Sequence, residues 1–184
     1  MLSTDYKPPI DTTKVTGKVV GLGSHRALQS KTDCDGIITH ASRSLADISG
    51  FTVDELIGQP HNILRHPDVP DTLYYLMWQE IQADNEFFGI VKNRCKNGDH
   101  YWVLTRVAPI MKNGEKVGYT SARFLPRGDL IPEWEELFEK MRGLEGPRDS
   151  ADPARFKPAI DEVERYVKRH GYSSLGQLVL SARA

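Results

Sequence analysis

Two Asn-Gly pairs, at 97–98 and 113–114, divide the second half of this chain into three segments with alternating apolar residues. Asn-Gly between apolar segments is the strongest short-range signal for a β-hairpin, because both residues accept the left-handed backbone of a tight turn. The segments 87–96, 100–111 and 116–125 are therefore predicted to be consecutive antiparallel strands. This three-stranded meander constrains the fold more than any other feature of the sequence.

Shorter elements precede the meander. Residues 26–32 and 36–40 are predicted to form two short strands, joined by turn-forming residues. A brief helix is expected to end near Gly50. Thr52 and Glu55 then have the spacing of a capping box, which indicates another short helical turn.

A longer helix is predicted immediately before the meander. Its apolar residues recur at the spacing of one helical face: Leu73, Tyr74, Met77, Trp78 and Ile81. Pro70 and Asp71 stand at its start, where a missing amide and an acidic side chain are both favourable. Residues 60–68 follow no regular period. Short helices on one face of an antiparallel sheet define an α+β domain, with further helices flanking it.

The sequence divides into four parts. Residues 1–24 resemble an irregular arm, 25–127 the sheet domain, 128–143 a flanking amphipathic helix, and 144–184 a linker with a C-terminal helical tail. The flanking helix and the tail helix can each dock a partner protein or a second copy of the chain. Each can equally pack back on its own sheet.

Composition excludes several classes of protein. The formal net charge is −1, so we expect no binding to nucleic acid. No segment approaches the ~20 apolar residues needed to span a bilayer, so direct membrane insertion is not expected. The start of the chain lacks the features of a signal peptide, and two cysteines are too few for a disulfide framework. These features predict a cytoplasmic location.

Four segments carry a resemblance to a known family: ITHAS at 38–42, SGFTVDELIGQPHNILRHPDVP at 49–70, GIVKNRCKNGDHYWV at 89–103 and VGYTSARFLPR at 117–127. In order and spacing they closely resemble the FAD-binding sensory PAS domains of bacterial aerotaxis receptors. The resemblance implies a PAS fold, in which short helices cup a five-stranded antiparallel sheet. It also implies that FAD binds between the sheet and the helices.

The RHPD segment contains Arg65, His66 and Asp68, and the resemblance implies that this segment is needed for FAD binding. A guanidinium group forks well onto phosphate or ribose oxygens, and an imidazole can donate beside it. The alternative is a surface arginine and a turn histidine. Asp68 either holds Arg65 in place or caps the helix that starts near Pro70.

Asn93 is predicted to lie at the polar edge of the flavin ring. Alternation along its strand places it on the inward face with Phe87, whereas Lys92 and Arg94 occupy the other face. An inward amide without a hydrogen-bond partner would destabilise the folded state by ~1–3 kcal/mol. It can donate to N5 or O4 of oxidised flavin and accept from N5–H of the reduced form. The alternative is an Asn bonded to neighbouring backbone.

Three further residues are candidates for contact with FAD. Trp78 lies on the apolar face of the long helix, where it is either a core residue or a flavin contact. Asn62 is either a polar contact or a turn cap. Phe87 stands where the family usually has a tryptophan, so the aromatic wall is kept and the indole N–H is lost. This difference bears on ring orientation and reduction potential.

Together with the composition, the resemblance implies a cytoplasmic redox or oxygen sensor with bound FAD. It would signal in trans to a chemoreceptor, a kinase or a similar protein, or through a homodimer. No nicotinamide-binding, P-loop, kinase or nucleophile-elbow motif is present, so we do not expect an enzyme, and no metal site is expected. One alternative is a haem-binding PAS gas sensor with His66 or His61 as the axial ligand. Another is a PAS interaction module without a cofactor.

Overall fold

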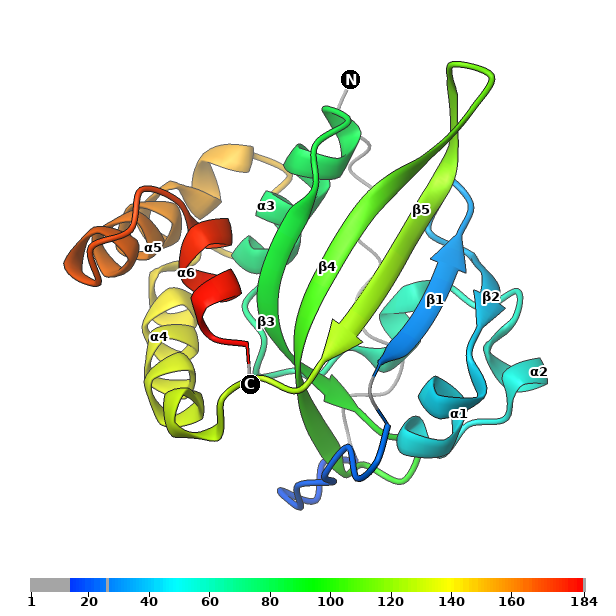
Figure 1. The fold of residues 1–184 in the computed structure, drawn as a ribbon. Helices are drawn as coiled ribbons and strands as arrows, with labels where there is room; N and C mark the ends of the chain where they lie inside the picture. Colours follow the sequence, from blue (N-terminus) through cyan, green and yellow to red (C-terminus); the bar gives the residue numbers. More distant parts are fainter. Residues whose placement is uncertain (1–13, 26, 184) are drawn as a thin grey trace.

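A five-stranded antiparallel sheet forms the centre of the computed structural model, which describes residues 14–25 and 27–183 (Figure 1). The strands are β1 (Leu28–Thr32), β2 (Ile38–Ala41), β3 (Phe87–Arg94), β4 (His100–Lys112) and β5 (Glu115–Phe124), in the spatial order β2-β1-β5-β4-β3. The sheet confirms the predicted α+β class and the meander of β3, β4 and β5. Residues 1–13 of the predicted arm and Arg26 lie outside the described residues.

The two Asn-Gly turns differ in length. Lys112 pairs directly with Glu115, and the two residues between them, Asn113 and Gly114, both have positive φ, at 53° and 82°. This is the two-residue hairpin that the sequence predicts. The turn between β3 and β4 is longer, because the Cys95 amide donates to the carbonyl oxygen of Asp99 at 2.7 Å. β3 therefore ends at Arg94, two residues before the predicted end.

Short helices cover one face of the sheet, which we call the inner face. They are α1 (Arg43–Ser49), α2 (Val53–Leu56), the 3-10 turn η1 (His61–Leu64) and α3 (Asp71–Gln82). Ser42 caps α1, since its Oγ accepts from the Leu45 amide at 3.2 Å. The predicted capping box of Thr52 and Glu55 is present in α2. Residues 60–68, for which no regular structure was predicted, contain η1.

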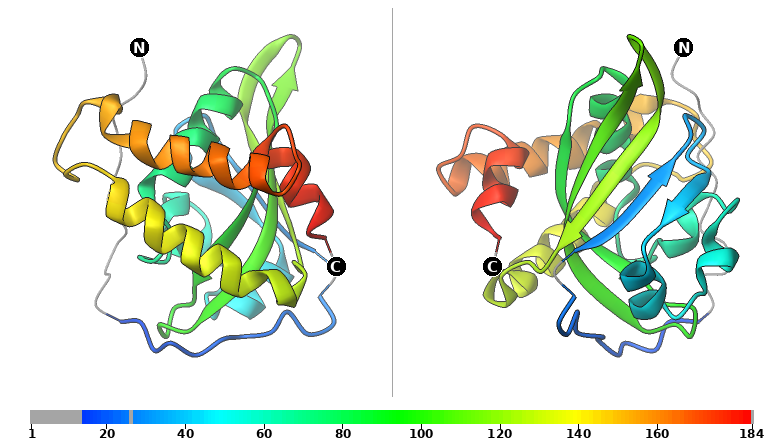
Figure 2. Two further views of the ribbon diagram at one scale, coloured as in Figure 1. Left: turned by 90° about the vertical axis from the view of Figure 1, so that its left-hand side faces the viewer. Right: turned by 45° about the vertical axis from the view of Figure 1, so that its right-hand side comes forward.

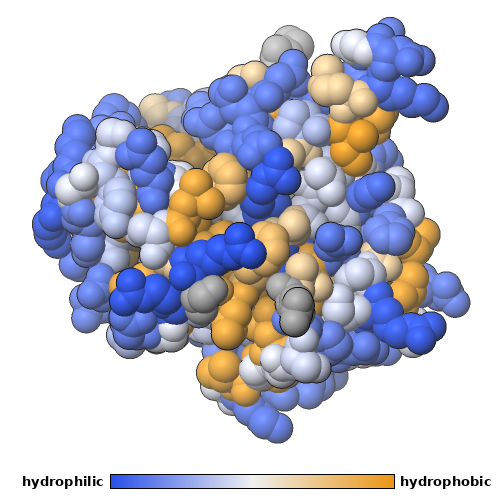
Figure 3. All heavy atoms as spheres, in the orientation of Figure 1, coloured by the Kyte–Doolittle hydropathy of each residue, from blue (hydrophilic) through white to orange (hydrophobic). Residues whose placement is uncertain are grey.

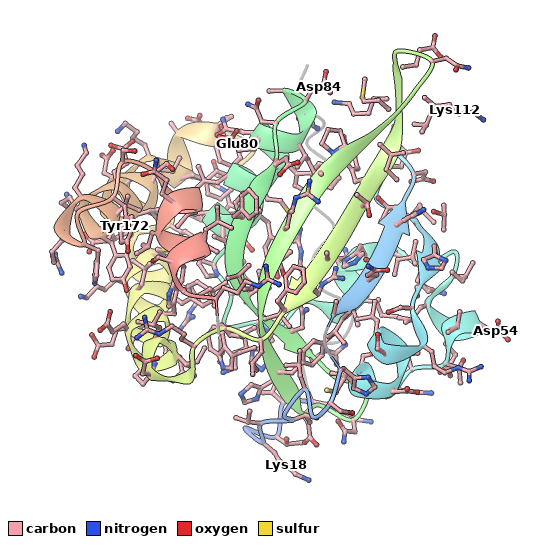
Figure 4. All side chains as sticks on the ribbon, viewed as in Figure 1. Lys18, Asp54, Glu80, Asp84, Lys112 and Tyr172 are labelled. Atoms are coloured by element: carbon pink, nitrogen blue, oxygen red, sulfur yellow. The ribbon has the colours of Figure 1, made fainter. Side chains whose placement is uncertain are left out.

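A lysine from the sheet ties down the end of α3. Lys116 Nζ donates to the carbonyl oxygens of Ile81 at 3.1 Å and Gln82 at 2.9 Å, and to Asp84 Oδ1 at 2.6 Å. A cation at this position satisfies carbonyl groups that have no partner within the helix and complements the helix dipole. Asp84 and the Lys112 hairpin tip consequently lie at the same end of the molecule (Figure 4).

A second layer of helices covers the opposite, outer face of β3 and β4. It consists of η2 (Gly128–Leu130), α4 (Ile131–Leu144), η3 (Pro153–Phe156), α5 (Lys157–Arg169) and α6 (Leu175–Ser181). Figure 2 shows α4 and α5 side by side. In Figure 3, apolar atoms gather on the face where this layer meets the sheet, with polar side chains around them. The amide of Arg127 donates to the Ala182 carbonyl at 2.8 Å, so the end of this layer returns to the end of β5.

Packing on the outer face decides between the two open interpretations of the flanking helix. The predicted apolar face of α4 is buried in this chain: Trp134, Leu137, Phe138 and Met141. Phe138 stacks on Trp102 of β4 with ring centroids 5.7 Å apart, and Trp134 packs edge-on against Tyr166 of α5 at 6.0 Å. The helix therefore packs back on its own sheet.

If α4 is part of the folded core, Trp134→Ala removes a large side chain that is only 2% exposed. We expect the free energy of unfolding to fall by about 3–5 kcal/mol, measured by urea denaturation. Leu144→Ala, at the more exposed end of the same helix, is the matched control and should lose less than about 1 kcal/mol. Equal stability of Trp134→Ala and the wild type would contradict this packing.

Candidate cofactor-binding site

A cavity of about 740 Å³ lies between the inner face of the sheet and α3. Small-molecule sites in proteins commonly enclose ~300–1,000 Å³. Its walls come from β1, β3, β4, β5, η1, α3 and the segment before α5. The cavity is thus assembled from parts of the chain that are far apart in the sequence.

Alternation along β3 determines which of its side chains reach the cavity. Phe87, Val91 and Asn93 line it, as the period of two predicts. At Gly89, which shares this face, a Cβ atom would lie 2.7 Å from the Phe87 ring. The absence of a side chain at this glycine lets the Phe87 ring lie against the strand.

The predicted apolar face of α3 also faces the cavity. All five of its residues line the cavity, and two of them, Leu73 and Ile81, are fully buried: Leu73, Tyr74, Met77, Trp78 and Ile81. The Trp78 ring meets Tyr119 of β5 edge-on, with centroids 5.6 Å apart. Trp78 is therefore a wall of the cavity.

Arg65 and Asn62 reach the cavity from η1 and the residue that follows it. The guanidinium carbon of Arg65 lies 3.6 Å from the centroid of the Tyr74 ring, a cation–π contact. The backbones of Arg65 and Asn93 form an antiparallel bridge. This bridge fixes the RHPD segment to β3, so the two predicted polar contacts, Arg65 and Asn93, are neighbours.

A buried cluster that we did not predict centres on Arg123, which is 3% exposed and lines the cavity. Its Nη1 donates to Ser30 Oγ at 3.2 Å, and its Nη2 lies 2.8 Å from His61 Nε2. Burial, reinforced by the positive charges of Arg123 and Arg65, lowers the pKa of His61 to about 3. A neutral His61 accepts the hydrogen bond from Arg123, and among the described residues no carboxylate pairs with this arginine.

Two of the predicted site residues do not line the cavity. His66 is buried with its Nδ1 accepting from the Asp68 amide at 3.2 Å, and burial lowers the pKa of His66 to about 4. Asp68 Oδ2 pairs with Lys92 Nζ at 2.7 Å. Pro70 is the N-cap residue of α3, and in the first turn the Thr72 amide donates to Glu145 rather than to Asp68, so the capping interpretation of Asp68 is wrong.

Three buried hydroxyl groups on the cavity wall have no hydrogen-bond partner among the described residues: Tyr74, Thr105 and Ser121. Burial raises the pKa of Tyr74 to about 12, so its hydroxyl is a donor at neutral pH. Unpaired buried polar groups each cost about 1–3 kcal/mol, and native proteins contain few of them. Tyr74 lies on α3 and the other two on the sheet, so the hydroxyl groups border the cavity from both sides; they fit a polar ligand, and the aromatic side chains of the lining fit a ring system.

The buried histidines predict a pH dependence of stability. The folded-state pKa values of His61 and His66 lie below the value of unfolded histidine, so the unfolded chain takes up protons first as the pH falls. Stability should therefore be complete above pH ~6.5 and decrease towards pH ~4. Urea denaturation at a series of pH values measures this slope.

His61→Gln keeps an acceptor for Arg123 but removes the titrating group. We expect the slope to decrease by about one proton between pH 6.5 and 4. His40→Gln on β2, an exposed position, is the control for loss of a histidine. An unchanged slope in His61→Gln would contradict the buried placement of His61.

Comparison with known proteins relates this architecture to a family. Residues 38–123 match the family model described as PAS fold. Over 127 residues the chain is 40% identical to the aerotaxis receptor of Escherichia coli (strain K12), a match that covers 69% of this chain and 25% of the receptor. It is 25% identical over 127 residues to the bacterioopsin transcriptional activator of Halobacterium salinarum, covering 64% of this chain and 19% of that protein. The chain thus spans a quarter or less of these relatives.

Solved structures show the same fold at lower identity. A light-oxygen-voltage domain studied with a flavin analogue superposes with a TM-score of 0.53 at 17% identity, covering 64% of this chain and 88% of that one. The light state of the blue-light photoreceptor Aureochrome1 LOV gives 0.52 at 18% identity, covering 66% and 94%. These likenesses support the five-stranded sheet and its helical cover.

None of the helices that the structure describes combines the length and the apolar character that crossing a bilayer requires.

Proposed function

Because residues 38–123 form a PAS domain that is related in sequence to the aerotaxis receptor, we propose that this chain binds FAD non-covalently in the cavity and senses oxygen or redox state. The observation that carries the proposal is that one cavity combines aromatic walls, cationic side chains and buried hydroxyl groups for which the described residues offer no hydrogen-bond partner. The physiological stimulus and the whole protein's activity are part of the proposal, since the relatives are much longer.

The cavity offers a group for each part of such a ligand. Phe87 and Trp78 provide aromatic walls for the ring, and Asn62 and Asn93 provide amides for its polar edge. Arg65 provides a guanidinium for phosphate or ribose oxygens. In this proposal His66 and Asp68 act indirectly, because they hold the RHPD segment in the shape that presents Arg65.

Arg123 adds a further group to the proposed site, on the sheet side of the cavity. A buried guanidinium whose partners are a hydroxyl group and a neutral imidazole remains poorly compensated. Negative charge on a ligand would compensate it. We therefore propose that Arg123 favours the more negative redox form of the bound ring.

We propose that β3 transmits the redox-dependent structural change from the cavity to the outer helices. When bound, a flavin takes up electrons together with a proton at N5, which reverses the hydrogen bonding required at that atom. The Asn93 side chain can meet either requirement, because its NH₂ group donates a hydrogen bond and its carbonyl oxygen accepts one. Lys92, the residue before Asn93, points to the outer face, and its Nζ lies 2.7 Å from Asp68 Oδ2 and 3.6 Å from Glu135 Oε1 of α4. A shift of β3 would thus reach the outer helices.

The path from Asn93 through Lys92 to α4 indicates where a partner protein would bind. We propose that a signalling protein in trans, such as a chemoreceptor or a kinase, or a second copy of this chain, responds to the outer layer of helices. The haem alternative has less support, because His61 Nε2 already accepts from Arg123 and His66 lies outside the cavity lining. No structural observation favours the interaction module without a cofactor.

An absorption spectrum of the purified protein before and after dithionite tests the proposal. We expect flavin bands in the blue and near-ultraviolet that bleach on reduction. A Soret band would establish the haem alternative instead. Colourless protein that takes up no added FAD would leave only the interaction module.

Asn93→Ala tests the redox response. We expect FAD affinity to fall by no more than about tenfold, because one neutral hydrogen bond is lost. The difference in amide hydrogen exchange of α4 between oxidised and reduced protein should disappear. Gln29→Ala, which removes an exposed amide from β1 of the same sheet, should retain that difference. A redox-dependent α4 in Asn93→Ala would rule out this role.

A further inference from the structure

The connection between α4 and α5, residues 145–156, crosses α3 and lines the same cavity as the PAS domain; we call it the strap. Glu145 Oε1 accepts from the amide of Thr72 at 2.6 Å. At the other end, the Phe156 ring stacks on Tyr75 with centroids 4.5 Å apart. Both ends are therefore attached to the N-terminal half of α3.

Two arginines of the strap share one carboxylate at the cavity wall. Arg155 Nη2 lies 3.2 Å and Arg148 Nε 3.5 Å from Asp71 Oδ2. The Asp71 and Arg155 side chains are only 3% and 6% exposed, whereas Arg148 is 54% exposed. Arg155 and Asp71 thus form a buried ion pair, and Arg148 adds a half-exposed guanidinium group beside it.

Contacts within the strap fix the guanidinium group of Arg155 in position. Its Nη1 donates to the carbonyl oxygens of Gly146 at 3.3 Å and Pro147 at 3.1 Å, and its guanidinium lies 4.2 Å from the centroid of the Phe156 ring. A guanidinium fixed in this way loses little conformational entropy when it binds an anion. It can therefore contribute strongly to affinity.

The strap also carries two carboxylates at the cavity wall. Asp149 and Asp152 also line the cavity, but both residues are exposed, so water and salt screen them. Asp152 Oδ1 is in addition engaged by the Ala154 amide at 2.9 Å, where it caps η3. Arg148 is half exposed and is screened in the same way, so the buried charged groups at this end of the cavity are the Arg155–Asp71 pair.

We propose that Arg148 and Arg155 bind the phosphate groups of the flavin ligand and so select a phosphate-bearing flavin over riboflavin. This rests on the proposed function, because it assigns the second end of the same ligand. Arginine matches phosphate through paired, charge-assisted hydrogen bonds. The aromatic and amide groups of β3 and α3 suit the ring, and the strap supplies cations outside the PAS domain itself.

The assignment also explains why a segment beyond the sheet is part of the cavity wall. Phosphate bound by the strap would hold residues 145–156 against α3. The strap leads directly into α5, so occupancy of the cavity would also stabilise the outer layer of helices.

Equilibrium titration of the flavin-free protein with riboflavin, FMN and FAD tests this inference. In Arg148→Ala and in Arg155→Ala we expect FMN and FAD to bind about tenfold or more weakly, since a charge-assisted hydrogen bond is lost. Riboflavin should bind within about twofold of its wild-type affinity, which also shows that the cavity is intact. Arg165→Ala on α5, where Arg165 pairs with Glu162, is the matched control and should change none of the three affinities.

The outcomes separate this inference from the function on which it rests. Wild-type protein that prefers FAD or FMN over riboflavin, with the preference reduced in Arg148→Ala, supports it. Wild-type protein that binds FAD while Arg148→Ala keeps the same preference overturns the inference alone. Wild-type protein that binds no flavin overturns both. Because Arg148 is half exposed, its replacement tests the phosphate contact even if Arg155→Ala fails to fold.

Discussion

The alternation of β3 is the constraint on which the rest of the structure depends. Asn93 faces the cavity, and Lys92, one residue earlier, faces the outer helices, so a single strand separates a ligand-sized space from an ionic cluster. The backbone bridge from Arg65 to Asn93 attaches the RHPD segment to the same strand. Polar groups on both sides of the sheet are therefore linked through one short stretch of backbone. A change of hydrogen bonding on one side has a direct physical route to the other.

Much of the fold could be predicted, because its signals are local. The Asn113-Gly114 turn, the Thr52 capping box and the apolar face of α3 each depend on residues within one or two turns of each other. Alternation correctly placed Asn93 inward for the same reason. The ends of elements were less predictable, since β3 stops where the Cys95–Asp99 hydrogen bond begins a longer turn.

What escaped prediction depends on contacts between distant segments. Arg123 meets His61 from 62 positions away, and an arginine near the end of a strand gives no local sign of burial. Its place two residues after Ser121 on the inward face was the available signal. His66 and Asp68 were expected beside the ligand, but Asp68 pairs with Lys92, and both lie with Trp102 and Phe138 on the other side of β3. The strap resembles a linker by composition, and only its contacts with α3 reveal more.

The outer layer of helices has a practical consequence for dividing this chain. Trp102 and Lys92 are buried beneath α4, and the Arg127–Ala182 hydrogen bond joins the end of the sheet to the residue that follows α6. A truncation after residue 127 would expose an aromatic surface and leave a buried lysine without Glu135. Such a fragment would tend to self-associate through that surface. The smallest unit that keeps the sheet in its native surroundings therefore extends through α6.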